Sequence, residues 1–287
     1  MDFTLNIDAT TCIRCGRCVR VCPSKIFTRQ AARGPVGLQN VESCIVCGHC
    51  VAACPTASVD HSEFPADKVH PIDYAAMPTP AQVMLLCEAR RSNRAFTSKP
   101  VPAEALDQIL EAAHRAPTAS NKQQVAYTLV TDPLRLREIS DFTIRTFDAI
   151  ARKLENPLLR PLLSRLLPQP YGYLPAFRRL TSEYAKGNDL ILRGATAVLL
   201  IHTPRANRFG TQDANLAYQN GSLMAESLGV SQFYTGFVCS AIQQDKKGSL
   251  LRSLGIDGVV HAGMALGIPA FRYPNYIDRK EIRVNRL

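Results

Sequence analysis

The sequence predicts an α+β protein of two domains, a small cysteine-rich domain followed by a larger domain of mixed helices and strands. The chain has 287 residues, 46% of them hydrophobic, which is enough for more than one domain and a full core. Eight of its ten cysteines lie between Cys12 and Cys54. After residue 80, segments of helical and of strand periodicity are mixed, which favours an α+β or α/β domain there.

The cysteines of the first domain form a duplicated motif. The stretch CIRCGRCVRVCP, Cys12 to Pro23, returns 32 residues later as CIVCGHCVAACP, Cys44 to Pro55. The spacing C-x2-C-x2-C-x3-C-P is typical of proteins with two 4Fe-4S clusters, in which three thiolates come from one turn and the fourth binds the other cluster. We therefore expect two ligand sets: Cys12, Cys15, Cys18 and Cys54 for one cluster, and Cys44, Cys47, Cys50 and Cys22 for the other.

Residues 1–60 resemble the bacterial two-cluster ferredoxins over their whole length, and we predict a ferredoxin-like domain over 1–63. Zinc sites are disfavoured, because they would use two C-x2-C pairs per metal rather than triplets. A disulfide framework is disfavoured because no signal pattern opens the chain, so a reducing cytoplasmic location is expected. His49, inside CGHC, is expected at the surface or beside a ligand, since four thiolates per cluster are already available.

The net charge of +10 raises the question of nucleic acid as a partner. Two oxidised clusters with their thiolates would each carry about −2, which leaves roughly +6. The basic residues are spread along the chain without a long run, so we predict no nucleic-acid partner. The longest apolar runs, such as AVLLI at 197–201, are too short to span a bilayer, and no membrane span is expected.

Residues 64–82 contain four prolines and no clear periodicity, and they are predicted to form a linker. Beyond it the expected helices cover 81–92, 102–117, 213–229 and 241–255, and the expected strands cover 124–132, 196–203 and 258–267. Cys87 and Cys239 lie among apolar residues on these segments. Both are expected to be small buried hydrophobes rather than nucleophiles.

The segment 155–175, rich in Leu, Pro and Arg, has no single interpretation. Its prolines should break any long helix. A lid over a pocket, a docking surface for a partner and a membrane-touching piece stay open as hypotheses. Tyr171, Tyr173 and Phe177 are candidates for the roof of a pocket, with simple core packing as the alternative.

The stretch ARRSNRAF, Ala89 to Phe96, places three guanidinium groups and a hydroxyl at a predicted helix end, a combination suited to a phosphate monoester. No G-x-G-x-x-G occurs in the chain, so a Rossmann site lacks its phosphate turn. From about residue 83 onward the chain resembles the nitroreductase family of FMN enzymes, and we predict such a domain over 83–287. The resemblance of RRSNRAF to a family motif implies FMN contacts from Arg90, Arg91, Ser92 and Arg94.

Four further stretches carry the resemblance. NDLILRGATAVLLI, Asn188 to Ile201, resembles the entry of a family strand, with Thr196 in place of a frequent Pro. APTASNKQQVAY matches a family segment at Pro117, Asn121 and Gln123, although Gln124 and Val125 stand where Pro and Trp are usual. Residues 213–238 resemble a helix and a turn whose backbone faces the flavin, which implies a main-chain amide near Tyr234, Thr235 and Gly236 at flavin N5. GIPAFRYPNYIDRK resembles the element that brings a basic side chain to the phosphate, with Arg279 and Lys280 as candidates.

The resemblance implies an α+β sandwich that forms a homodimer, with FMN between the subunits. We expect an oxidoreductase in which a low-potential donor such as a ferredoxin reduces two 4Fe-4S clusters and FMN. The electrons then pass to a small electrophilic acceptor, such as a nitroaromatic, a quinone or an activated alkene. No indispensable catalytic acid or base is expected. Two alternatives stay open: an NAD(P)H-oxidising flavoenzyme that exports electrons through its clusters, and a non-catalytic electron-transfer subunit.

Overall fold

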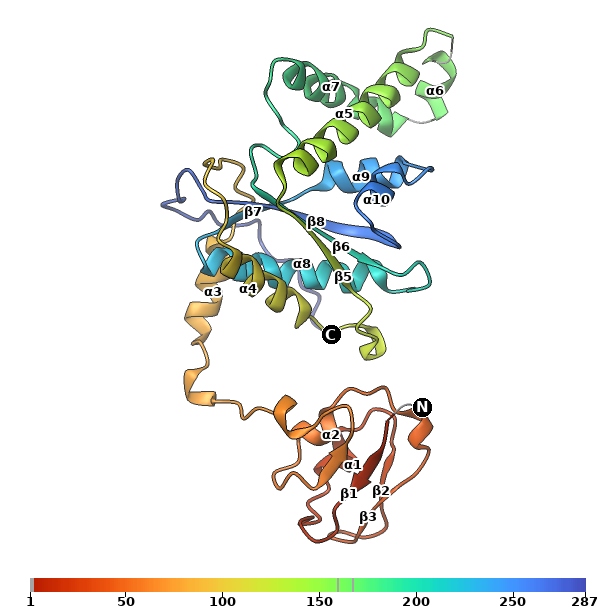
Figure 1. Ribbon diagram of the computed structural model, residues 1–287, viewed down its shortest axis with the longest axis vertical. Helices are drawn as coiled ribbons and strands as arrows, with labels where there is room; N and C mark the ends of the chain where they lie inside the picture. Colours follow the sequence, from red (N-terminus) through yellow and green to blue (C-terminus); the bar gives the residue numbers. More distant parts are fainter. Residues whose placement is uncertain (1–2, 159, 167) are drawn as a thin grey trace. The chain divides into compact units, whose positions relative to one another are not determined.

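The computed structural model describes residues 3–158, 160–166 and 168–287 (Figure 1). The chain divides into two compact units. The first consists of Met1–Pro78 with Ala119–Lys122, and the second of Thr79–Thr118 with Gln123–Leu287. Within the described ranges, no helix is long and apolar enough to cross a membrane.

The first unit is built from two short antiparallel strand pairs and two short helices. β1 (Leu5–Ile7) pairs with β4 (Val59–His61), and β2 (Phe27–Arg29) pairs with β3 (Val36–Leu38). The helices α1 (Arg17–Val21) and α2 (His49–Ala52) each follow a glycine in the left-handed region, with φ of 72° at Gly16 and 71° at Gly48. The small core contains two of the cysteines, so the unit depends on its sulfur sites for part of its stability.

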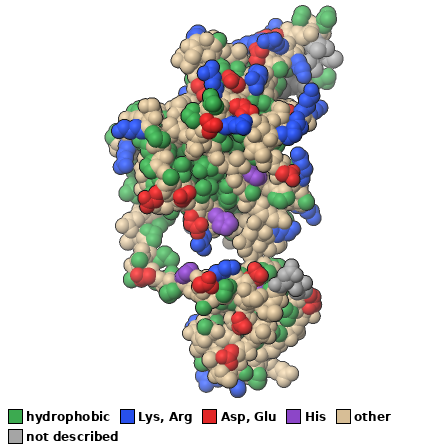
Figure 2. All heavy atoms as spheres, in the orientation of Figure 1, with side chains coloured by type: hydrophobic (Ala, Val, Ile, Leu, Met, Phe, Trp, Pro, Cys, Tyr) green, Lys and Arg blue, Asp and Glu red, His purple; other side chains and the backbone are tan. Residues whose placement is uncertain are grey.

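After β4, the end of the first unit contains two single 3-10 turns, η2 (Ala66–Lys68) and η3 (Tyr74–Ala76), and the second unit begins with α3 (Pro80–Ala89). A capping box between Thr79 and Gln82 begins α3. No residue of α3 is buried, and hydrophobic side chains lie at the surface along this segment (Figure 2). The prediction for Cys87 is therefore wrong, because its helix packs no residue into the core and the thiol is exposed.

The second unit is organised around a four-stranded antiparallel sheet in the order β5-β6-β8-β7. Its strands are β5 (Ala126–Val130), β6 (Ala197–Thr203), β7 (Ser231–Tyr234) and β8 (Val259–Gly267). Every residue of β6 is buried: the apolar run Ala197–Ile201, as its sequence predicts, and also the polar His202 and Thr203 that end the strand.

Helices cover both faces of this sheet (Figure 1). On one face, Ala197, Leu199 and Ile201 of β6 pack with α4 (Ala103–His114) and α8 (Gly210–Ser227). On the other, Val198 and Leu200 pack with α5 (Pro133–Glu155), α9 (Gly236–Gln244) and α10 (Ser249–Ser253). The predicted α+β sandwich is confirmed.

Two expected elements differ in the structure. The helix expected over 241–255 is divided into α9 and α10, because the Asp245 carboxylate accepts hydrogen bonds from the amides of Ser249 and Leu250 and so caps a new helix. The expectation that prolines break any long helix in 155–175 is wrong for its second half. There α6 (Arg160–Leu166) is followed by α7 (Pro168–Ala185), which contains Pro175 in its interior. A helix tolerates the lost hydrogen bond where tertiary contacts hold its axis, and α7 is fastened to α5.

Candidate functional site

The eight motif cysteines line two separate cavities in the first unit. One cavity is lined by Cys12, Cys15, Cys18 and Cys54, and the other by Cys22, Cys44, Cys47 and Cys50. Each cavity therefore takes three cysteines from one motif and the last cysteine from the other, as the ligand sets expected from the spacing require. Among the described residues, no group of three or more His, Cys, Asp or Glu is spaced to hold a single metal ion.

The thiols of each set are close enough to influence one another electrostatically. Burial raises the pKa of Cys50 to about 11, and the neighbouring Cys47 and Cys44 add to this shift. Burial likewise raises the pKa of Cys18, with further contributions from Cys12 and Cys15. Thiolates that converge in this way are costly to form together unless a bound cation offsets their charge. Each set of four cysteines can thus supply the four sulfur ligands that an iron–sulfur cluster needs.

Hydrogen-bond donors approach one sulfur of each set. Cys54 Sγ accepts from the Ser58 amide at 3.2 Å and lies 3.8 Å from the Thr56 hydroxyl. Burial alone would raise the pKa of Cys54, but the backbone amides of Thr56, Ser58 and Val59 and the Thr56 hydroxyl together outweigh it, and the pKa is lowered. In the other set, Cys44 Sγ accepts from the Val46 amide at 3.4 Å and lies 3.8 Å from His61 Nε2. His49 is exposed, in line with its expected place outside the ligand sets.

A larger cavity of about 690 Å³ lies in the second unit beside the turn between β7 and α9. It is lined by aromatic and aliphatic side chains, by Arg94 and Arg193, and by Tyr234, Thr235 and Gly236. Arg94 lies over the Phe233 ring, with 5.4 Å between its Cζ atom and the ring centroid. The described lining includes no Asp or Glu, so the cavity suits a ligand with an apolar ring system and negative charge.

The N-terminus of α9 opens onto this cavity. Thr235 is the N-cap residue and makes no side-chain capping bond, and Gly236, Phe237 and Val238 form the first turn. The amides of a first turn have no acceptor within their own helix, so they can donate to a ligand. The Thr235 amide itself donates to the Gly263 carbonyl at 2.8 Å, which fixes the turn to β8.

The structure brings only some of the expected flavin contacts together. Four of the twelve residues line the cavity, namely Arg94, Tyr234, Thr235 and Gly236. Ser92 and Arg91 belong to the same loop, where the Ser92 carbonyl accepts from Arg94 and Arg91 donates to the Ile277 carbonyl. Arg90 lies near Glu226, whose pKa burial raises and Arg90 lowers.

The remaining expected contacts lie elsewhere in the single chain. Pro117, Arg279 and Lys280 are exposed, and Gln123 lines a small separate cavity next to His114 and Tyr127. The Asn121 amide belongs to the first unit, where it donates to the carbonyl oxygens of Ile45 and Val46. These five residues are not among those that line the large cavity.

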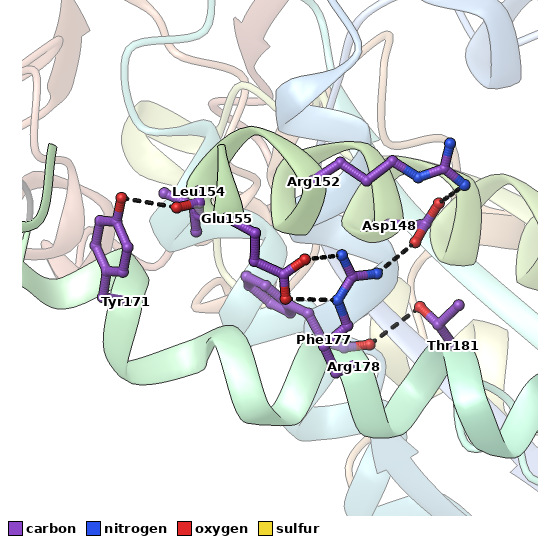
Figure 3. Close-up of polar contacts among 8 residues, drawn as sticks. All are labelled: Asp148, Arg152, Leu154, Glu155, Tyr171, Phe177, Arg178 and Thr181. Carbon is purple, nitrogen blue, oxygen red and sulfur yellow. Dashed lines mark hydrogen bonds and ion pairs between the residues drawn. The ribbon is translucent and has the colours of Figure 1, made fainter. Parts of the chain in front are cut away.

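Helix α7 supplies part of the cavity wall. Tyr173 and Phe177 line the cavity, whereas the Tyr171 hydroxyl donates to the Leu154 carbonyl at 2.9 Å. Phe177 stacks on Phe147 of α5 with 4.7 Å between ring centroids. Figure 3 shows Arg178 between two acidic residues of α5, where it pairs with Glu155 and, at 2.9 Å, with Asp148. Of the three hypotheses for 155–175, this geometry favours a lid.

We expect an Arg178→Ala change to loosen α7 over the cavity, because it removes both ion pairs at once. Hydrogen–deuterium exchange measures this directly, and amides of α7 should exchange several-fold faster than in the wild type. Arg152→Ala is the matched control, since Arg152 pairs with Asp148 alone from an exposed position and such pairs contribute little. Equal exchange in the two variants would contradict a fastening role for Arg178.

Two residues that line the cavities, Arg193 and His61, were not predicted from the sequence. Arg193 reaches the cavity from a left-handed backbone conformation with φ of 58°, and its pKa is lowered first by burial and then by Arg94 and Arg179. His61 reaches the second cysteine cavity through the β1–β4 pairing. An Arg-Gly pair before a buried strand could have signalled a special turn at Arg193. No local signal marks His61, because its cavity partners are distant in sequence.

Comparisons with known proteins agree with this architecture. Residues 87–268 match the family model described as "Nitroreductase family", and residues 4–55 match the "4Fe-4S dicluster domain". A crystal structure from Bacteroides fragilis, described as a nitroreductase with bound FMN, is 22% identical with a TM-score of 0.52, covering 71% of this chain and 99% of that one. One from Desulfitobacterium hafniense, also described as a nitroreductase with bound FMN, is 18% identical with a TM-score of 0.54, covering 70% and 97%. At these identities the two structures show the fold.

A curated relative from Bacillus subtilis (strain 168), described as "FMN reductase [NAD(P)H]", is 47% identical over 51 residues. Those residues are 18% of this chain and 20% of the relative, so the match spans about a fifth of that protein.

Proposed function

The chain belongs to the nitroreductase family and carries a 4Fe-4S dicluster domain, and from this premise we propose that it is an iron–sulfur flavoprotein oxidoreductase. The two predicted resemblances are confirmed by these matches. In the proposed reaction, a low-potential donor such as a ferredoxin supplies electrons, and a small electrophilic acceptor receives them. The observation that carries the proposal is the presence, in one chain, of two four-cysteine cavities and a cationic aromatic cavity at a helix N-terminus.

FMN is the cofactor that fits the large cavity. When bound, FMN can take up electrons singly and release them as a pair, which matches one-electron clusters to a two-electron acceptor. The aromatic and aliphatic walls would hold its ring, and the first amides of α9 would donate to it. Arg94 and the neighbouring Arg90, Arg91 and Ser92 would supply charge and hydrogen bonds to its polar groups.

The acceptor is proposed to bind over the flavin under α7. Tyr173 and Phe177 provide apolar surface, and Arg193 provides positive charge. The described lining residues include no Asp or Glu that would neutralise this charge. Such a wall suits a flat electrophile with polar oxygens, such as a nitroaromatic, a quinone or an activated alkene. The chain's own role is to exclude water and to position the acceptor, and no acid–base side chain is assigned.

We expect the protein to be a homodimer. The lining of the large cavity within one chain does not include five of the expected contacts, Pro117, Asn121, Gln123, Arg279 and Lys280, which supports their contribution from a second copy. The exposed apolar side chains of α3, Val83, Met84 and Leu85, would be covered by the same association. Light scattering after size-exclusion chromatography should give twice the mass of one chain. A monomer that retains bound FMN would contradict this arrangement.

The direction of electron flow decides between the proposal and its first alternative. The curated relative's name includes NAD(P)H, so nicotinamide is a specific competitor as donor. In anaerobic stopped-flow experiments we expect reduced ferredoxin to bleach the flavin rapidly and NAD(P)H to do so slowly. Rapid bleaching by NAD(P)H would favour a flavoenzyme that exports electrons through its clusters. Purified protein with iron but without FMN would favour a non-catalytic electron-transfer subunit.

A further inference from the structure

The charges of the first unit are segregated along the chain. Residues 9–41 contain six Lys or Arg and no Asp or Glu, whereas Asp8 and Glu42 flank this stretch. Three of the cations belong to the first cysteine motif, and the duplicated motif provides an internal comparison. Arg14, Arg17 and Arg20 correspond to Val46, His49 and Ala52 of the second motif. The duplication therefore shows that the cluster-binding turn does not require arginine at these positions.

The cations gather around the first cavity rather than the second. Arg17 lines the cavity of Cys12, Cys15, Cys18 and Cys54. Arg29 Nη1 donates to the Arg14 carbonyl at 3.2 Å, and its guanidinium lies against Gly16. The described lining of the second cavity contains no Lys or Arg. Arg20 follows Arg17 by three residues on α1, so the two side chains are neighbours on the helix surface. We call Arg14, Arg17, Arg20 and Arg29 the arginine face.

The same face exposes the edge of the first cysteine site. Cys15 is exposed, whereas its counterpart Cys47 is partly buried. The adjacent Ile13 side chain is 60% exposed. A cluster bound here would therefore lie close to the surface, next to a small apolar patch surrounded by positive charge. This combination is suited to a transient electron-transfer encounter, in which charge steers the approach and the contact area is small.

We propose that the arginine face is the docking surface for an acidic electron-donor protein, which delivers electrons to the cluster of Cys12, Cys15, Cys18 and Cys54. The inference rests on the proposed function, because it assumes a protein donor. The occupant is acidic because residues 9–41, which contain the four arginines, include no Asp or Glu, and no ion pair among the described residues involves these arginines. Electrostatic steering acts on the association rate, which falls as salt screens the charges.

The test uses the holoprotein and an acidic two-cluster ferredoxin, with cluster reduction followed by anaerobic stopped flow. The variant Arg14→Val/Arg17→His/Arg20→Ala gives the first motif the residues that the second motif has at the same positions. Valine is compatible with the left-handed backbone of residue 14, because Val46 has a φ of 51° at the equivalent position. We expect its second-order rate constant to fall about tenfold at low salt and to depend less on salt. The neutral 5-deazariboflavin radical should reduce wild type and variant equally, and iron content should be unchanged.

Lys246→Ala/Lys247→Ala removes exposed charges from the second unit and should leave the rate with ferredoxin close to that of the wild type. Equal rates for the wild type and the arginine variant, or loss of reactivity with the neutral reductant as well, would overturn the docking proposal. Failure of the proposed function gives a different result, in which no ferredoxin reduces the wild type while NAD(P)H does.

A separate observation concerns His61 at the second cavity. The His61 ring is 1% exposed, stacks on Phe3 with 4.8 Å between centroids, and meets the edge of Phe64 at 5.1 Å. Its Nδ1 accepts a hydrogen bond from the Glu63 amide at 3.2 Å. A nitrogen that accepts carries no proton, so the proton of the neutral ring is on Nε2, the atom 3.8 Å from Cys44 Sγ.

We infer that His61 is a positioning residue that donates through Nε2 to the Cys44 thiolate and raises the reduction potential of that cluster. A hydrogen bond to a ligating sulfur stabilises the reduced, more negative state. The other cavity has no histidine in its described lining, so this effect distinguishes the two clusters.

Redox titration monitored by electron paramagnetic resonance tests this inference. His61→Phe keeps a ring for Phe3 and Phe64 but removes the donor, and we expect the midpoint potential of one cluster to become more negative while the other stays unchanged. His61→Gln, which retains an N–H donor, should recover part of the shift. Unchanged potentials in His61→Phe, or an equal shift of both clusters, would overturn the assignment.

Discussion

A Cys54→Ala variant is expected to lose the cluster bound by Cys12, Cys15 and Cys18, although Cys54 belongs to the second motif. The reason is geometric, since Cys54 lines the first cavity and not the cavity of its own motif. Iron analysis of anaerobically purified protein should fall from about eight to about four atoms per chain. The cluster of the second motif, including its His61 contact, should remain.

Two further variants test this expectation, the equivalent change in the first motif and a control at a cysteine outside both motifs. Cys22→Ala should remove the cluster of Cys44, Cys47 and Cys50 and leave the other intact. Cys87→Ala should leave the iron content unchanged, because that thiol is exposed and lines neither cysteine cavity. Loss of the second motif's own cluster in Cys54→Ala would show that each motif binds its own iron. A retained flavin spectrum would show that the second unit is still folded.

The cluster sites were predictable from the sequence because their geometry is local. Three cysteines of each expected ligand set fall within seven residues, and the left-handed Gly16 and Gly48 let each loop turn around its cavity. The place of the fourth cysteine follows from the same spacing, since a short helix carries it to the other cavity. The main strands and helices of the second unit were predictable for a similar reason, because periodicity reports which side chains face the sheet.

Features that depend on tertiary contacts were not predictable in this way. Cys87 has an apolar neighbourhood in sequence, yet nothing in the described part of the chain covers its helix enough to bury any of its residues. Pro175 lies inside a helix because Arg178 and Phe177 hold α7 on α5, a pairing that local propensity cannot report. Arg193 and His61 reach their cavities across long stretches of sequence.

The second large effect is expected from Gly263→Ala, a change beneath the turn that faces the large cavity. Gly263 lies on β8, and a Cβ atom there would overlap Thr235 Oγ1 and come within 3.3 Å of Leu200 Cδ2 and 3.4 Å of Cys239 Sγ. The overlap should displace Thr235, which is the N-cap of α9 and is fixed to β8 by its amide. Overpacking of this kind destabilises a fold by about 1–3 kcal/mol.

The larger consequence concerns FMN, because the first amides of α9 are the donors that the proposal assigns to the flavin. A displacement that costs the complex about 1.4 kcal/mol raises the Kd of FMN about tenfold. We therefore expect purified Gly263→Ala protein to contain iron as in the wild type but much less FMN. The ratio of flavin to iron, measured on the same sample, reports this loss without relying on turnover.

A second substitution separates the position of the turn from the chemistry of its side chain. Thr235→Ala alone removes the hydroxyl but keeps the backbone amides, so it should retain FMN. Gly263→Ala/Thr235→Ala removes the overlapping atom and leaves only the contacts with Leu200 and Cys239, which small shifts can relieve. FMN content should therefore recover in the double variant. If Thr235→Ala itself releases FMN, the hydroxyl rather than the backbone holds the flavin. If the double variant does not recover, the turn is not what positions FMN, and the assignment of the α9 amides to the flavin is wrong.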